Sequence, residues 1–165
     1  MTALATALPA PLVLPPDRRQ SGVAMGVRRG VRRLFADLGH VTLPEVSLAN
    51  GRRADLMALG ENGLVTIVEI KSCLADFRAD RKWPDYRDYC DRLYFAVPET
   101  MAPEVLPECC GLIVADSFGA AILRDAPCHP LAGARRKAVT LRFAHAAARL
   151  LHGLEDPDAV REGAL

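Results

Sequence analysis

The sequence predicts an α/β sandwich with a mixed central sheet. Apolar residues recur at helical spacing near both ends of the chain, and short, largely apolar runs bounded by Gly, Asn and Pro lie between them. The first three of these runs follow one another through tight turns, while the later ones are separated by longer segments. With 165 residues, half of them apolar and a quarter charged, the chain suits one soluble core and is short for two. We therefore expect one domain over residues 21–153.

The two ends of the chain are expected to lie outside the domain. Residues 1–20 are rich in Pro and Ala and are expected to form a disordered tail, and residues 154–165 a frayed C-terminus. No basic residue precedes Arg18, so the charged start of a signal peptide is missing, and no later run is long enough to span a membrane. Five scattered cysteines agree with a reducing compartment, so we expect a cytoplasmic protein.

The first half of the domain is expected to be a helix followed by three meandering strands. Ser21 can cap a helix that ends at Gly39, and four arginines lie on its polar face. Strands are expected over 43–49 and 52–59, joined at Asn50-Gly51, and over 64–70 after a second tight turn. The third strand is apolar on both faces, which is typical of a central strand. The expected inward helix residues are Val23, Val27, Val31, Leu34, Phe35 and Leu38.

The second half is expected to alternate short helices with strands and to close with a helix. Residues 72–90 suggest one or two short helices interrupted at Trp83-Pro84, because Pro disfavours helical geometry in the preceding residue. Further segments are expected as follows: strand 92–97, a helical turn at 103–107, paired strands 111–115 and 120–124, a polar loop at 126–137, and an amphipathic helix at 140–152 with Leu141, Ala144, Ala148 and Leu151 inward.

Three charged residues stand out within the apolar meander: Asp55, Glu69 and Lys71. Alternate residues of a strand share a face, so Glu69 and Lys71 point the same way. If the loop before the third strand has three residues with Gly63 left-handed, the register places Asp55 opposite Glu69. A similar loop at residues 49–51 would add Glu45 to the group, whereas a two-residue turn at Asn50-Gly51 would send Glu45 to the other face unless a bulge intervenes.

Two explanations of this charged group remain open at this point. Charges are rare inside an apolar strand because desolvating them is costly unless they are paired or bind a metal. The group can be an ion-pair cluster in which Lys71 neutralises Asp55 and Glu69. Alternatively, two carboxylates exceed the charge of one lysine, and hard oxygen ligands of this kind suit Mg²⁺ or Mn²⁺.

The arrangement resembles the PD-(D/E)XK nuclease superfamily, in which an Asp, a turn and a strand ending in Glu-x-Lys follow an N-terminal helix. The segments 51–55, 69–72, 76–86 and 89–98 are more specific, and over about residues 21–152 they are similar to the bacterial MmcB-like family of DNA repair proteins. The proline that usually precedes the first Asp is Ala54 here. The resemblance implies a restriction-endonuclease-like three-layer sandwich with a mixed central sheet flanked by helices.

The resemblance also implies a metal-dependent hydrolysis of DNA phosphodiesters. Asp55, Glu69 and the carbonyl of Ile70 would hold Mg²⁺ or Mn²⁺, and Glu45 would be an accessory ligand or would bind a water held by the metal. Lys71 would orient or help activate the attacking water and stabilise charge on the phosphate. DNA would be contacted by Arg52, Arg53, Ser72, Lys82, Trp83 and Tyr86, although Trp83 and Tyr86 can instead pack the helical insertion onto the sheet.

The expected partners are DNA and, as a further option, a repair polymerase or another repair protein. The net charge of +1 neither indicates nor excludes nucleic acid, so any DNA surface has to come from local Arg and Lys clusters. Bound to DNA, such a protein would be associated with the bacterial nucleoid. Two other functions stay open: a non-catalytic DNA-binding accessory protein that recruits repair enzymes, and a structural domain. A zinc site is a weaker alternative, with candidate ligands Cys109, Cys110, Cys128 and His129.

Overall fold

A six-stranded sheet forms the centre of the computed structural model, which describes residues 21–157. The strands lie in sequence order across the sheet: β1 His40–Ser47, β2 Arg53–Gly60, β3 Val65–Ile70, β4 Arg92–Val97, β5 Gly111–Ala115 and β6 Ala120–Arg124. β3 and β5 pair in parallel with β4, and the other neighbours are antiparallel. The predicted α/β class and mixed sheet are therefore confirmed.

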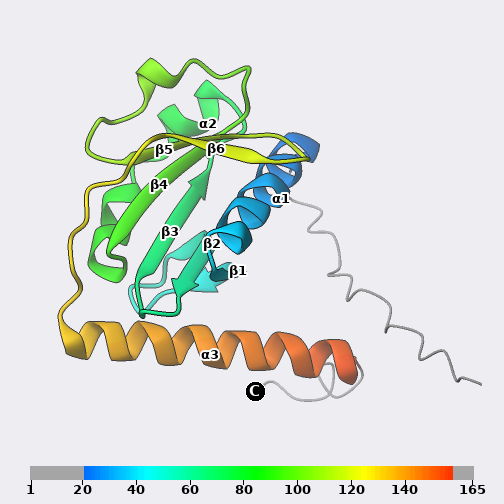
Figure 1. Cartoon of the computed structure of the whole chain (residues 1–165), viewed down its shortest axis with the longest axis vertical. Helices are drawn as coiled ribbons and strands as arrows, with labels where there is room; N and C mark the ends of the chain where they lie inside the picture. The colour runs from blue at the N-terminus through cyan, green and yellow to red at the C-terminus, as the bar shows by residue number, and fades with distance from the viewer. Residues whose placement is uncertain (1–20, 158–165) are drawn as a thin grey trace, which may run out of the picture.

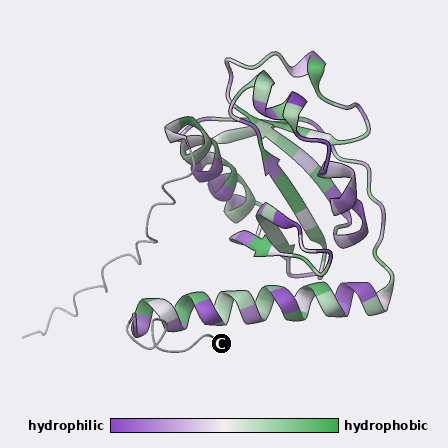
Figure 2. Ribbon diagram, turned by 180° about the vertical axis from the view of Figure 1, so that it is seen from behind, coloured by the Kyte–Doolittle hydropathy of each residue, from purple (hydrophilic) through white to green (hydrophobic). Residues whose placement is uncertain are grey.

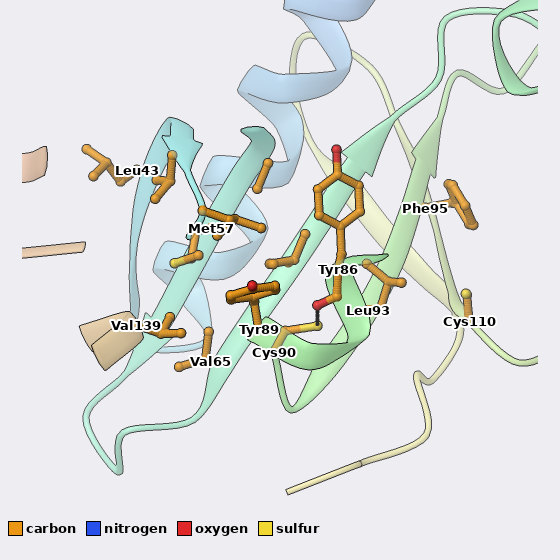
Figure 3. Close-up of a cluster of buried hydrophobic side chains, with 14 of the residues drawn as sticks. Leu43, Met57, Val65, Tyr86, Tyr89, Cys90, Leu93, Phe95, Cys110 and Val139 are labelled. Carbon is orange, nitrogen blue, oxygen red and sulfur yellow. Dashed lines mark hydrogen bonds between the residues drawn. The ribbon is translucent and has the colours of Figure 1, made fainter. Parts of the chain in front are cut away.

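Helices cover both faces of this sheet and make three layers. They are α1 Gly22–Asp37, α2 Leu74–Ala79, the 3-10 helices η1 Trp83–Tyr89 and η2 Pro103–Val105, and α3 Gly133–Glu155. α1 packs on one face through Val27, Val31 and Phe35. η1 and α3 pack on the other, where their side chains join those of the strands in a second core cluster (Figures 1 and 3). Alternation along β3 supplies both cores, with Ile67 in one and Val68 in the other.

All six predicted strands occur, but β1 begins three residues earlier than expected and β2 begins one residue later. Strands β4, β5 and β6 have the predicted bounds, and β3 begins one residue later than expected. The Ser21 side chain accepts a hydrogen bond from Ala24 N at 3.1 Å, which confirms the predicted cap of α1. The prediction that Val23 and Leu38 point inward is wrong, because their side chains are 50% and 51% exposed. They lie in the first turn and just past the end of α1.

The predicted orientation of the last helix is also wrong. α3 begins at Gly133, inside the expected polar loop, and its buried side chains are Val139 and Phe143. Leu141 and Leu151, expected inward, are 52% and 44% exposed, and Ala144 and Ala148 are exposed as well. Apolar and polar residues alternate along the whole helix (Figure 2), so the sequence offers several similar stripes and packing selects one.

The expected tail at residues 1–20 lies outside the described residues, as do residues 158–165. α3 continues to Glu155, two residues beyond the expected end of the domain. Within residues 21–157, no helix has the length and apolar character that a membrane crossing requires.

Candidate functional site

The turn between β2 and β3 sets the register that brings Asp55 to Glu69. Gly63 has a φ of +77°, and Gly60 N donates to the Leu64 carbonyl at 3.0 Å. Leu59 pairs with Val65 and, further along, Leu56 with Val68. The next position along this register places Asp55 opposite Glu69, which is the arrangement expected when Gly63 is left-handed.

The turn between β1 and β2 repeats this scheme and settles the position of Glu45. Gly51 has a φ of +78°, and Leu48 N donates to the Arg52 carbonyl at 2.7 Å, so the loop has three residues. The neighbouring pairs are Pro44 with Leu56 and Val46 with Ala54, which puts Glu45 opposite Asp55. Glu45 itself has a φ of +60°, a strained conformation for a residue with a side chain.

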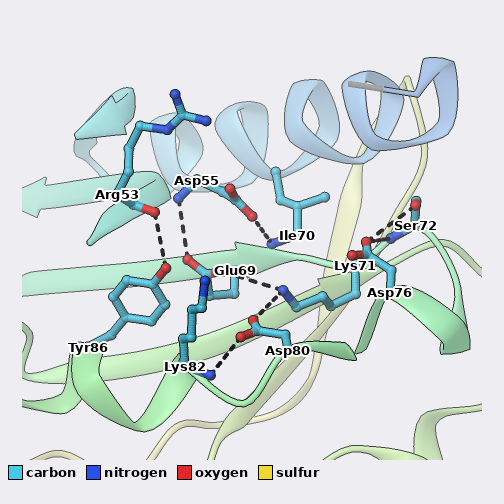
Figure 4. A network of polar contacts seen from close by, with 10 residues as sticks. All are labelled: Arg53, Asp55, Glu69, Ile70, Lys71, Ser72, Asp76, Asp80, Lys82 and Tyr86. Atoms are coloured by element: carbon cyan, nitrogen blue, oxygen red, sulfur yellow. Dashed lines mark hydrogen bonds and ion pairs between the residues drawn. The ribbon is translucent and has the colours of Figure 1, made fainter. Parts of the chain in front are cut away.

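Asp55 and Glu69 each bond the backbone of the opposite strand (Figure 4). Ile70 N donates to Asp55 Oδ2 at 2.9 Å, and Asp55 N donates to Glu69 Oε1 at 3.4 Å. These bonds extend the antiparallel pairing beyond Leu56 and Val68, the last paired residues of the β2–β3 ladder at this end. Each carboxylate keeps a second oxygen for another partner.

Lys71 is held mainly by a residue that the sequence did not single out. Its Nζ lies 3.5 Å from Glu69 Oε2 and 2.6 Å from Asp80 Oδ2. Asp80 follows the last residue of α2, and its Oδ1 accepts from Lys82 N at 2.8 Å. Asp80 was missed because it lies nine positions after Lys71 in a different element, and no spacing rule links the two.

Burial raises the pKa of both strand carboxylates, and neighbouring carboxylates raise it further. Burial raises the pKa of Glu69, the charge of Asp55 adds to it, and the result is about 8 despite the nearby Lys71. The pKa of Asp55 is raised by burial, which outweighs the hydrogen bond from Ile70 N. Burial lowers the pKa of Lys71, but the hydrogen bond to Asp80 and the surrounding carboxylates more than offset it, so Lys71 stays charged. The cluster therefore favours an additional cation or a proton.

A pocket of about 370 Å³ opens beside these carboxylates. It lies between the N-terminal end of α1 and the C-terminal end of β3 and is lined by Ser21, Ala24, Asp55, Glu69, Ile70, Lys71, Ser72 and Asp76. Ser72, predicted to contact DNA, is on the rim, where its backbone N donates to Asp76 Oδ2 at 3.2 Å. The pocket gives small ligands access to carboxylates that are otherwise buried.

The donor atoms around this pocket fit a hard divalent cation. Asp55 and Glu69 supply carboxylate oxygens, and Ile70 lines the same pocket. Across residues 21–157 there is no group of three or more His, Cys, Asp or Glu side chains placed to hold a metal, so backbone or water oxygens would have to complete the coordination. The candidate zinc ligands Cys109, Cys110, Cys128 and His129 therefore do not form such a group in this part of the chain. Glu45 pairs instead with Arg53 Nε at 2.7 Å and lies 3.9 Å from Arg28.

The side chains predicted to contact DNA have different surroundings. Arg52 pairs with Asp85 at 2.8 Å, and Lys82 is exposed beside the lysine–carboxylate cluster. Tyr86 is only 6% exposed, belongs to the core, and donates its hydroxyl hydrogen to the Arg53 carbonyl at 3.1 Å. Its ring therefore has the packing role that the sequence left open. Trp83 is partly buried and meets the Phe95 ring edge-on, with 5.7 Å between centroids.

The fold and the cluster define a three-layer α/β domain with a half-buried aspartate, a buried glutamate and a buried lysine at an open pocket. The chain belongs to the DNA repair protein MmcB-like family, whose sequence model matches residues 13–158. The resemblance to the MmcB-like family seen in the sequence is thus confirmed, and the protein belongs to a DNA repair family.

A solved structure from Silicibacter pomeroyi has the same fold. The SPO1766 protein of unknown function from Silicibacter pomeroyi is 42% identical with a TM-score of 0.80, over 84% of this chain and 94% of that chain. A repair endonuclease from Pyrococcus abyssi is 16% identical with a TM-score of 0.35, over 54% of this chain and 42% of that chain, a similarity too low to support inference. No match is found among curated proteins.

Proposed function

We propose that this protein is a divalent-metal-dependent nuclease that hydrolyses DNA phosphodiesters during repair. The observation that carries the proposal is the meeting of Asp55, Glu69 and Lys71 at one pocket, where the turn at Gly63 brings Asp55 to Glu69. The raised pKa of Glu69 adds support, since a buried carboxylate of this kind is stabilised by a nearby cation. Membership of a DNA repair family makes DNA the substrate to test.

Each residue of the site has a separate role in this proposal. Asp55, Glu69 and the Ile70 carbonyl would hold Mg²⁺ or Mn²⁺, and Glu45 would support Asp55 from β1. The ion would supply Lewis acidity and lower the pKa of water. Lys71 would place its charged amine against the phosphate, where negative charge increases in the transition state. Asp80 would position that amine through its 2.6 Å contact.

The proposed reaction consumes one water molecule. A bond forms between the water oxygen and phosphorus, and the bond from phosphorus to one deoxyribose oxygen breaks. That deoxyribose oxygen takes up one proton of the water, and the other proton remains on the new phosphomonoester or passes to solvent. Arg53 and Lys82, exposed on either side of the cluster, would bind the flanking phosphates, with Arg52 and Ser72 at the margins. Trp83 would contribute through its exposed edge.

A second candidate is a DNA-binding accessory protein without catalytic activity, which recruits a repair polymerase or nuclease. The specific observation in its favour is that Lys71 lies closer to Asp80 than to Glu69, at 2.6 Å against 3.5 Å. An amine engaged in this way is less available to a phosphate. Cleavage assays separate the two candidates because both of them predict DNA binding.

The test is cleavage of single-stranded, nicked, branched and damaged DNA in Mg²⁺ or Mn²⁺. Asp55→Asn and Lys71→Ala are expected to reduce cleavage at least a hundredfold, with DNA binding retained. Asp88→Asn is the matched control, because Asp88 is an exposed carboxylate on η1 away from the pocket. Cleavage that survives both site substitutions would refute the mechanism, and binding without any cleavage by the wild type would favour the accessory role.

A further inference from the structure

The outer edge of the sheet carries a second, unassigned surface. A hollow of about 730 Å³ lies between β1 and α3, and another of about 620 Å³ lies between β1 and α1. The first follows residues 43–47 of β1 and the second follows residues 40–42, and Arg28 borders both. The two hollows share Arg28 and follow successive parts of the same edge strand, and we call the pair the β1 trough.

The β1 trough is strongly basic, although the whole chain is almost neutral. Its single acidic residue is Glu45, which already pairs with Arg53 at 2.7 Å. Arg29 and Arg149 are exposed and make no ion pair with any residue between 21 and 157. The arginines that line the trough are Arg28, Arg29, Arg32, Arg33, Arg142 and Arg149. Such a concentration of one charge attracts an anionic partner.

The backbone of β1 makes a protein strand a poor occupant of this edge. Pro44 has no N–H to donate, and the positive φ of Glu45 interrupts the extended conformation in the middle of the strand. A second copy of this chain would also bring a second set of arginines to the same place. These features disfavour the addition of a strand to β1.

The lining suits a single strand of DNA better than a small anion. Apolar side chains form part of the trough, among them Leu43, Pro44 and Leu150, with arginines beside them. A single strand exposes bases and sugars that can lie against such a surface while its phosphates meet the arginines. A duplex hides its bases and would use only the charges.

We propose that the β1 trough binds single-stranded DNA and continues the path of the strand held at the carboxylate site. Ala24 lines the carboxylate pocket and Arg28, one helical turn later on α1, lines the trough. Glu45 lies in the trough and opposite Asp55. The proposal goes beyond cleavage because it assigns a separate surface, and it is tested by binding alone.

The experiment measures fluorescence anisotropy of a labelled single-stranded oligonucleotide in EDTA over a range of salt. If Arg29 and Arg149 each neutralise one phosphate, the double variant Arg29→Gln with Arg149→Gln should bind more weakly. Its slope of log affinity against log salt should be smaller by about 1.4. Arg149→Lys keeps the charge and should retain the wild-type slope. Lys137→Gln removes an exposed charge on α3 outside the trough and should also leave the slope unchanged.

The outcomes are distinct from those of the cleavage test. Thermal unfolding checks that each variant is folded, which is expected because both arginine side chains are exposed. An unchanged slope in the double variant would overturn the proposal, whatever happens to cleavage. An equal reduction in affinity for a blunt duplex would overturn the assignment to a single strand, and tighter binding of RNA with the same sequence would overturn the assignment to DNA.

Discussion

Two charged clusters of this protein shift the pKa of a buried carboxylate in opposite directions. Asp91, 2% exposed, accepts hydrogen bonds from Val65 N at 2.7 Å and Leu131 N at 2.8 Å, and both terminal nitrogens of Arg136 lie 2.7 Å from its oxygens. Burial raises the pKa of Asp91, but these bonds more than offset it, so the pKa is lowered. At the carboxylate pocket, burial raises the pKa of Glu69 to about 8.

This difference in pKa shift distinguishes the structural cluster from the candidate binding site. Asp91 has a partner for every acceptor position, and it fixes the start of α3 to the sheet through Arg136. Lys71 lies 3.5 Å from Glu69 but is held mainly by Asp80 at 2.6 Å, and it acts on Asp55 only through its charge. A satisfied carboxylate stabilises the fold, whereas two incompletely satisfied ones cost stability, and that cost is typical of a binding site.

The largest expected effect comes from breaking the satisfied cluster. Arg136→Met leaves Asp91 buried without its cation and is expected to reduce the free energy of unfolding by about 3–5 kcal/mol. Urea unfolding measures this, with an unchanged slope against denaturant. Lys137→Met, at the exposed neighbouring position, should change stability by less than about 0.5 kcal/mol. Equal stabilities of the two variants would show that the Asp91 bonds contribute little.

The second largest effect is expected in the pH dependence of stability, where Glu69 and Asp91 should act in opposite directions. Between the ordinary pKa of a glutamate and about 8, folded Glu69 holds a proton that the unfolded chain releases, so stability without metal falls as pH rises. The expected loss from pH 5 to pH 8 is about 3 kcal/mol, at about 1.4 kcal/mol per pKa unit. Asp91 acts in the opposite direction, because its lowered pKa gives stability that is lost only in acid.

Urea unfolding in EDTA at several pH values measures this decline. Glu69→Gln cannot release a proton and should remove most of it. A decline of the same size in the variant would mean that other groups cause it.

A smaller effect is expected at the residue that holds Lys71. Asp80→Asn removes a charged hydrogen-bond partner and should destabilise the protein by about 2 kcal/mol. The pKa of Lys71 should fall, since the bond to Asp80 is the main contribution that raises it. NMR titration of the Lys71 side chain gives the direction. A Lys71 pKa that does not change would remove Asp80 from its proposed positioning role.

Local chemistry explains how much of the fold could be predicted. Gly51 and Gly63 fix loop lengths, and these set the register of three strands and the meeting of Asp55 with Glu69. The bounds of β4 to β6 follow from short apolar runs between turn residues. Such signals involve residues close together in the chain, which is why they can be read without a structure.

The errors and omissions involve distant partners. The predicted inward face of α3 was wrong because alanines occupy most of its stripes, and the position of the helix depends on Arg136 reaching Asp91, 45 positions away. Asp80 was missed because its role depends on where the segment after α2 folds back onto β3. The β1 trough joins elements from both ends of the domain, so sequence clusters of arginine could not reveal it.

Thermodynamic stabilisation by Mn²⁺ tests the central claim most directly, namely that Asp55 and Glu69 form a metal site. At pH 8 and a metal concentration ten times the dissociation constant, the wild type should gain about 1.4 kcal/mol in the free energy of unfolding. Asp55→Asn should lose this gain, while Asp88→Asn should keep it. An equal gain in Asp55→Asn, or none in the wild type, would contradict the account.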